Sequence, residues 1–89
     1  MNRKFLIIIP TLNNHNSLSK TLDNIKFQNY DNYHIIIVDS SDKKISILNQ
    51  KIISKKNLKK ISYFYSFIKG TSAQRNQGVC YAKDNNIDY

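Results

Sequence analysis

Seven residues in three short stretches of the chain could together bind a nucleotide. An aspartate accepts hydrogen bonds from a base N–H or from ribose hydroxyls, and an arginine offers a fork of donors to carbonyl or phosphate oxygens. An arginine in the first turns of a helix also adds to the positive end of that helix. The candidate binding residues are Pro10, Thr11, Asn13, Asp39, Ser41, Arg75 and Asn76.

Each of these stretches follows a segment that should form part of an open α/β sheet. Residues 5–9 and 33–38 are apolar, β-branched runs of strand length, and residues 61–66 are apolar and aromatic. We expect the first strand to lie in mid-sheet and to end at Pro10, which cannot extend a central ladder. Asp39 would then follow the second strand, at the carboxyl edge where open α/β sheets bind ligands.

Apolar residues at helical spacing predict helices between and after these strands. They are Leu18, Leu22 and Ile25 in the first helix, which should end near residues 29–32, and Ile45, Leu48 and Ile52 in the second. A third helix should begin after Gly70 and fade at residues 84–86. The expected caps are Asn16 or Ser17 for the first helix, Ser40, Ser41 or Asp42 for the second, and Thr71 or Ser72 for the third.

The alternation of strands and helices predicts an α/β fold with an open, Rossmann-like parallel sheet and flanking helices. Residues 87–89 look like the start of a further strand. A strand order of 3-2-1-4 would place that further strand beside residues 5–9. Without it, we expect residues 5–9 to form an unpaired edge of the sheet. We therefore interpret residues 1–89 as a single partial domain, the amino-terminal part of a larger fold.

The sequence excludes several kinds of site. The chain has two glycines, and neither lies in the loop after residues 5–9, so that loop is neither a dinucleotide fingerprint nor a Walker loop. The sequence has no nucleophile elbow that would join His15 or His34 in Ser-His-Asp catalysis. It also has no cluster of histidines and cysteines that could bind a metal. The single cysteine, Cys80, excludes an internal disulfide, and we interpret it as a small buried side chain on a helix in a reducing, cytosolic setting.

The net charge of +8 would suit nucleic acid, an anionic membrane surface or a phosphorylated small molecule. The lysines concentrate at Lys51, Lys55, Lys56, Lys59 and Lys60, without arginines or interleaved aromatic residues. We interpret this cluster as a solvated face or a peripheral membrane contact, and we expect no nucleic-acid partner. The apolar run at 5–9 is too short for a signal peptide or a membrane span, so we expect a cytoplasmic protein, either free or membrane-associated.

Three segments, in order, resemble the amino-terminal, nucleotide-binding portion of the family 2 GT-A glycosyltransferases. Residues Ile7–Asn13 look like the apolar strand and P-x-x-N loop, Ile36–Asp42 like the V-D-D-x-S-x-D segment, and Gly70–Gly78 like the G-x-x-x-A-R-N-x-G helix. Two positions depart from the pattern. Ser40 stands where many members carry a second acid, and Gln74 interrupts the A-R-N part.

The resemblance implies a glycosyltransferase that takes a nucleotide sugar, a UDP-sugar, and transfers the sugar with inversion to a saccharide or lipid acceptor in polysaccharide or glycolipid synthesis. By the same resemblance, Thr11 and its loop would line the base and ribose, Asp39 would contact the uracil or ribose, and Arg75 would reach the base or phosphates. Gly78 would let its helix pack closely.

The family's D-x-D motif, which binds a divalent metal (Mg or Mn), and its catalytic base have no counterpart in these 89 residues. We therefore expect the chain to supply no catalytic residue and no metal ligand, and to be inactive alone. Two other functions stay open on the residues alone. One is a basic nucleic-acid-binding module, and the other is a non-catalytic α/β interaction domain in which Asp39 and Arg75 form a structural ion pair.

Overall fold

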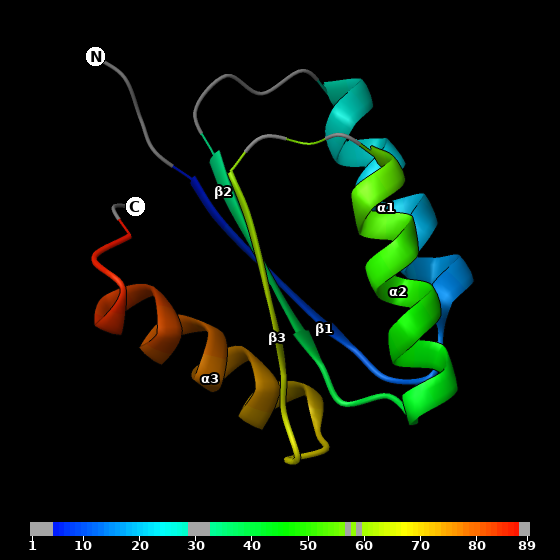
Figure 1. The fold of residues 1–89 in the computed structure, drawn as a ribbon. Helices are drawn as coiled ribbons and strands as arrows, with labels where there is room; N and C mark the ends of the chain where they lie inside the picture. Colours follow the sequence, from blue (N-terminus) through cyan, green and yellow to red (C-terminus); the bar gives the residue numbers. More distant parts are fainter. Residues whose placement is uncertain (1–4, 29–32, 57, 59, 88–89) are drawn as a thin grey trace.

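The computed structural model describes residues 5–28, 33–56, 58 and 60–87, which form an α/β fold (Figure 1). The elements are β1 (Phe5–Thr11), α1 (His15–Gln28), β2 (Tyr33–Asp39), α2 (Lys43–Lys56), β3 (Ile61–Tyr65) and α3 (Thr71–Asp84). The strands of the described residues form one parallel sheet in the order β1-β2-β3. Helices α1 and α2 cover one face and α3 covers the other. The predicted open parallel sheet with flanking helices is confirmed.

The central strand β2 explains why the sequence carries a continuous apolar run. Residues 35–38 are completely buried. Ile35 and Ile37 pack with Leu22 under α1 and α2, whereas Ile36 and Val38 pack on the opposite face, toward α3. Because successive side chains of a strand point to opposite faces, a strand covered on both sides must be apolar at every position.

Strand β1 lies at an edge of the sheet that the described residues form, as expected, since the further strand predicted to pair with it is not among them. Strand β1 runs past its predicted end, with Pro10 opposite Val38. The Thr11 carbonyl accepts the Ser40 N–H at 3.0 Å, so the backbone polar groups of Thr11 face β2. Because these groups alternate in direction along a strand, those of Pro10 face away from β2, where the absence of an N–H costs no hydrogen bond to β2. Ile87 is not in a strand, and the rest of the predicted further strand, residues 88–89, lies outside the described residues.

The predicted caps of the first and third helices were wrong. Asn14 caps α1, because its Oδ1 accepts the Ser17 N–H at 3.1 Å. Gly70 is the N-cap residue of α3, with φ of 134°, and no side chain makes a cap bond there; Thr71 is already the first helical residue. The predicted end of the first helix falls on residues outside the described ranges, since α1 is described as far as Gln28.

The buried stripes of α2 and α3 also differ from prediction. Leu48 is 40% exposed, whereas Ser46 and Asn49 are the buried residues of α2. Cys80, predicted to be buried, is exposed. Its helix turns another stripe of small and polar residues inward, namely Gln74, Gly78 and Ala82.

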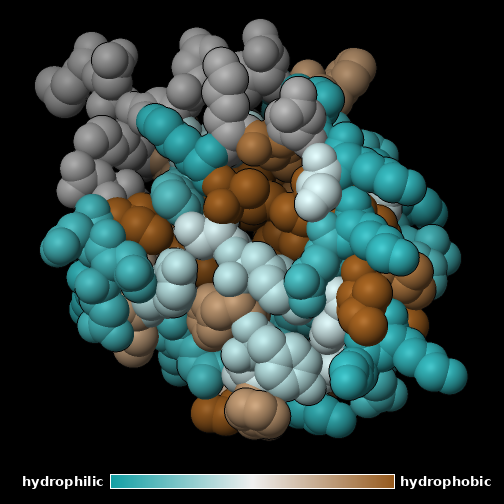
Figure 2. All heavy atoms as spheres, viewed as in Figure 1, coloured by the Kyte–Doolittle hydropathy of each residue, from teal (hydrophilic) through white to brown (hydrophobic). Residues whose placement is uncertain are grey.

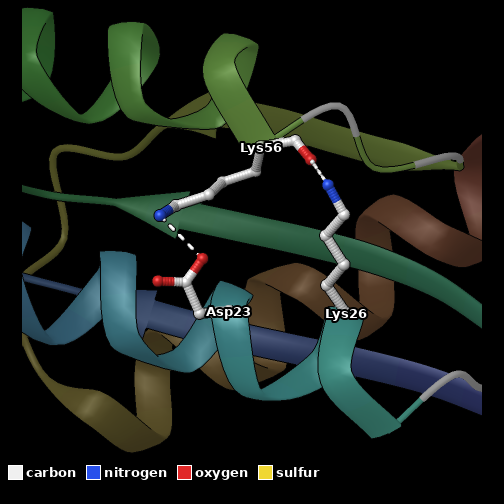
Figure 3. Close-up of polar contacts among 3 residues, drawn as sticks. All are labelled: Asp23, Lys26 and Lys56. Atoms are coloured by element: carbon white, nitrogen blue, oxygen red, sulfur yellow. Dashed lines mark hydrogen bonds and ion pairs between the residues drawn. The ribbon is translucent and has the colours of Figure 1, made fainter.

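Helices α1 and α2 are joined by lysine contacts (Figure 3). The Lys56 ammonium lies 2.7 Å from the Asp23 carboxylate, and the Lys26 ammonium donates to the Lys56 carbonyl at 3.1 Å. Because the Asp23 side chain is 59% exposed, the ion pair contributes at most about 1 kcal/mol. Figure 2 shows hydrophilic side chains over the outer sides of the helices and apolar ones over the middle of the same face. None of the helices in the described ranges has the length and hydropathy that crossing a bilayer requires.

Gly78 brings α3 close to β1, as predicted. A Cβ atom at this position would lie 2.6 Å from Cγ2 of Ile8, far inside van der Waals contact. Cγ2 is attached directly to the stiff, β-branched Cβ of Ile8, so it cannot swing aside. The helix therefore needs a residue without a side chain at the point where it crosses the strand.

We expect Gly78→Ala to lower the free energy of unfolding by about 1 kcal/mol, because the overpacking penalty exceeds the gain in helix propensity. Urea unfolding followed by far-ultraviolet circular dichroism measures this change, with the exposed Ser72→Ala in the same helix as the control. If Gly78→Ala were more stable than the wild type, α3 would not pack against Ile8 as described.

Candidate functional site

The loops that follow β1 and β2 are bonded to each other at the carboxyl edge of the sheet. The Asn13 N–H donates to the Ser41 hydroxyl oxygen at 2.8 Å, and the Asp42 N–H donates to the Asn13 side-chain carbonyl at 2.8 Å. Asn13 has φ of 52°, in the left-handed region that asparagine tolerates better than most residues. Asn13 and Ser41, both predicted to bind a ligand, thus lie together and hold two loops in one position.

Asp39 lies completely buried beneath these loops. Its Oδ1 accepts the Ser41 N–H at 2.9 Å, and its Oδ2 accepts the Asn49 amide at 3.1 Å and the Tyr63 hydroxyl at 2.6 Å. Burial by itself would raise the pKa of the Asp39 carboxyl, but hydrogen bonds from Ser41, Tyr63 and Asn49 outweigh burial and hold that pKa below its ordinary value of 3.8. Asp39 is therefore charged at neutral pH and enclosed by protein donors.

Tyr63 supplies the shortest of these bonds from β3. Burial, and then its hydrogen bond to Asp39, raise the pKa of the Tyr63 hydroxyl to about 12. The hydroxyl consequently keeps its proton and remains a donor to Asp39 throughout the physiological pH range.

Asn49 and Gln74 were missed as site residues by the sequence interpretation. Asn49 is fully buried, and its amide donates to Asp39 and, at 3.4 Å, to the Ser41 hydroxyl, while its Oδ1 has no partner among the described residues. The signal present in the sequence was spacing alone, since Asn49 stands four residues after Ile45 and three before Ile52, and it does not reveal the partners of the side chain.

Gln74 joins both strands to α3. Its Nε2 donates to the Thr11 carbonyl at 3.2 Å and to the Val38 carbonyl at 2.9 Å, and its Oε1 accepts the Gly70 N–H at 3.3 Å. In the sequence this residue was only a departure from the family pattern. In the structure its side chain fixes the start of α3 at the carboxyl edge of the sheet.

Ser40, the other residue that departs from the family pattern, holds the segment between β3 and α3. Its hydroxyl is buried and donates to the Ile68 carbonyl at 2.7 Å. Ser66, the residue after β3, is hydrogen-bonded to Gln77 of α3. The serine directly after Asp39 therefore makes a structural contact.

A pocket of about 290 Å³ opens between the β1–α1 loop and the start of α3. Pro10 and Thr11 form part of its wall, and so do Gly70, Thr71 and Gln74 from the other side. The remaining lining residues are Ile9, Leu12, Asn14, Ser17, Leu18 and Thr21. The pocket is therefore bounded by two of the three segments that resemble the family, Ile7–Asn13 and Gly70–Gly78.

The structure does not gather all the predicted residues at this pocket. Arg75 is exposed, one helical turn after Thr71, and it forms no ion pair with Asp39, although both residues are described. Asn76 faces a different hollow, which it shares with Phe64 and Tyr81. The structural ion pair that the interaction-domain alternative required is thus not formed.

The described residues offer no set of ligands for a divalent metal. Nowhere in the described ranges do three or more histidine, cysteine, aspartate or glutamate side chains come together. The buried carboxylate of Asp39 is already engaged by Ser41, Asn49 and Tyr63. No step of the chemistry can be assigned to a metal held by these residues.

Comparison with known families decides the kind of domain. The family model described as glycosyl transferase family 2 matches residues 6–87, which contain all the described strands and helices except the first residue of β1. The chain belongs to glycosyl transferase family 2. A comparison with curated proteins finds no match. The pocket and the loops around it are therefore the carboxyl edge of a glycosyltransferase-type domain.

We expect Tyr63→Phe to lower the free energy of unfolding at pH 7 by about 2 kcal/mol, the usual contribution of a hydrogen bond to a charged group. Urea unfolding measures the change, and Tyr65→Phe, in the same strand but 43% exposed, is the matched control.

The same pair of variants tests the charge of Asp39. Because the pKa of Asp39 is lower in the folded state than its ordinary value of 3.8, the charged carboxylate stabilises the folded state. This stabilisation is complete above pH 3.8 and is lost as the pH falls through the pKa of the folded state. The deficit of Tyr63→Phe should therefore shrink as the pH falls below 3.8 and the Asp39 carboxylate takes up a proton. A deficit equal to that of Tyr65→Phe, or one independent of pH, would show that the Tyr63 hydroxyl does not hold a charged Asp39.

Proposed function

We propose that this family 2 domain binds the nucleotide-sugar donor, a UDP-sugar, at the carboxyl edge of its sheet, for transfer to a saccharide or lipid acceptor. The observation that carries the proposal is the 290 Å³ pocket between the β1–α1 loop and the start of α3, in a domain of this family. The pocket has room for part of a nucleotide, and its wall combines apolar side chains with the hydroxyls of Thr11, Ser17 and Thr71.

The start of α3 supports an anionic ligand. Gly70 has no side chain and no side-chain cap bond closes the helix, so the first N–H groups after it have no partner within the helix. Gly70 and Thr71 line the pocket, and exposed Arg75 lies one turn further along. We propose that these N–H groups and the Arg75 guanidinium receive the diphosphate.

Pro10 and Thr11 would contact the base or ribose from the opposite wall, as the family resemblance implies. Asp39 is completely buried and already accepts bonds from Ser41, Asn49 and Tyr63, so it can reach the base or ribose only if the groups that cover it move. Ser41 bonds both Asp39 and the Asn13 loop, so a ligand that moves this loop also changes the environment of Asp39. We propose Asn13, Ser41 and Asp39 as one coupled unit, and Asn76 as a more distant contact.

The experiment is a titration of the chain with UDP by isothermal calorimetry, with ADP for comparison. Arg75→Ala should weaken UDP binding by about tenfold or more, because a charge-assisted hydrogen bond is lost. Lys83→Ala removes one positive charge from an exposed position in the last turn of the same helix and should leave UDP affinity unchanged.

Equal loss in both variants, or no saturable binding at millimolar UDP, would contradict the proposed site. Binding of a labelled single-stranded RNA that depends steeply on salt and is unaffected by Arg75→Ala would favour the nucleic-acid alternative instead.

A second expectation concerns activity. Because the described residues provide neither a metal-ligand set nor a free carboxylate in the pocket wall, we expect the isolated 89-residue chain to bind UDP-sugar without transferring the sugar. Incubation with radiolabelled UDP-glucose and a lipid or oligosaccharide acceptor, followed by product separation, checks this. Transfer above the level of a protein-free control would contradict it.

A further inference from the structure

Phe27 is exposed to an unusual degree for a large apolar side chain. It is the next-to-last residue of α1 and is 88% exposed. The other apolar residues of this helix, Leu18, Leu22 and Ile25, are turned into the core. Phe27 therefore contributes nothing to the packing of the described fold.

Positive side chains from both helices surround this end of the molecule. We use the term "basic end" for a set of five lysines, Lys26, Lys51, Lys55, Lys56 and Lys60. Four of these lysines are exposed, and Lys56 is half-buried. Among the described residues, the acidic side chain in contact with the basic end is Asp23, which is paired with Lys56. The basic end consequently keeps a large excess of positive charge.

The basic end is held as one unit by the contacts drawn in Figure 3. The Lys26 bond to the Lys56 carbonyl and the Lys56 bond to Asp23 tie the last turn of α1 to the last turn of α2. Lys60 belongs to the same end, because it precedes β3 and its carbonyl accepts the Ile35 N–H, near the start of β2. Lysines from two helices and a loop thus lie at the same end of the molecule as Phe27.

This end lies opposite the candidate donor pocket. Helices α1 and α2 run back from the carboxyl edge of the sheet, so their last turns lie at the amino edge, while the loops after the strands lie at the other end (Figure 1). A flat surface in contact with the basic end would leave the pocket open to solvent.

We propose that the basic end docks on an anionic lipid bilayer, with the Phe27 ring inserted at the boundary between headgroups and acyl chains. Lysines near an anionic bilayer attract its headgroups, and an aromatic side chain adds the apolar contact that lysines lack.

A lipid surface fits these residues better than a nucleic acid does. Proteins that bind single strands use a groove with successive aromatic side chains, and sequence readers commonly use arginine. The basic end has lysines only, and Phe27 is its one aromatic residue within the described parts of α1 and α2. A second copy of the chain is disfavoured by repulsion between two sets of lysines.

The experiment is co-sedimentation of the chain with large unilamellar vesicles. One set contains phosphatidylcholine only, and the other contains equal parts of phosphatidylcholine and phosphatidylglycerol. We expect binding to the second set only, weakened by salt. Phe27→Ser should reduce the partition coefficient severalfold, and the double variant Lys51→Glu with Lys55→Glu should reduce it by more than tenfold.

Matched controls come from the opposite end of the molecule. Lys43→Glu with Lys44→Glu changes the net charge equally at the start of α2, and Phe67→Ser removes a side chain that is 90% exposed before α3. These controls should retain most of the binding, and circular dichroism confirms that each variant is folded.

Three outcomes would overturn the proposal: no binding to anionic vesicles, equal losses in the test and control variants, or tighter binding to a single-stranded oligonucleotide that depends on the same lysines. UDP affinity should be unchanged in the double variant Lys51→Glu with Lys55→Glu, so the donor site and the membrane contact can fail independently.

Discussion

A charged carboxylate with no access to water needs hydrogen-bond donors on every side, and much of this fold supplies them to Asp39. The donors come from the loop after β2, from α2 and from β3, through Ser41, Asn49 and Tyr63. Removing one of them would leave a buried charge partly unpaired, which costs more than an exposed ion pair contributes. Asp39 therefore fixes how α2 and β3 lie against the central strand.

Contacts on the opposite face of the sheet fix the position of α3 in a similar way. Gln74 bonds the carbonyls at the ends of β1 and β2, and Gly78 allows α3 to touch Ile8 of β1. As a result, the start of α3 and the β1–α1 loop stand at a fixed separation. The pocket lies between these two segments.

The apolar pattern of the sequence was sufficient to predict the order of elements and their parallel arrangement. Buried β-branched runs determine the strands, and Leu18, Leu22 and Ile25 mark the inward face of α1 as expected. Polar residues on inward faces could not be predicted, because their partners lie far away in the sequence. Gln74, for example, bonds the Thr11 carbonyl, 63 residues away.

Other differences depend on tertiary context in the same way. Whether Pro10 belongs to a strand depends on which side of β1 has a neighbour, and the sequence of β1 does not contain that information. The exposure of Cys80 follows from the unusual buried stripe of α3, which contains glycine and glutamine. Of the candidate site, the sequence indicated Pro10 and Thr11 at the pocket, but not the separation of Asn76 from it.

The most direct test of the central claim is a series of proton–nitrogen correlation NMR spectra of the chain recorded while UDP is added. If the donor binds at the carboxyl edge, the largest amide shifts will occur at Thr11, Leu12, Thr71 and Ser72, with smaller shifts at Asn13 and Ser41. Shifts concentrated in the second half of α2, or unchanged spectra at millimolar UDP, would contradict the placement of the donor in this pocket.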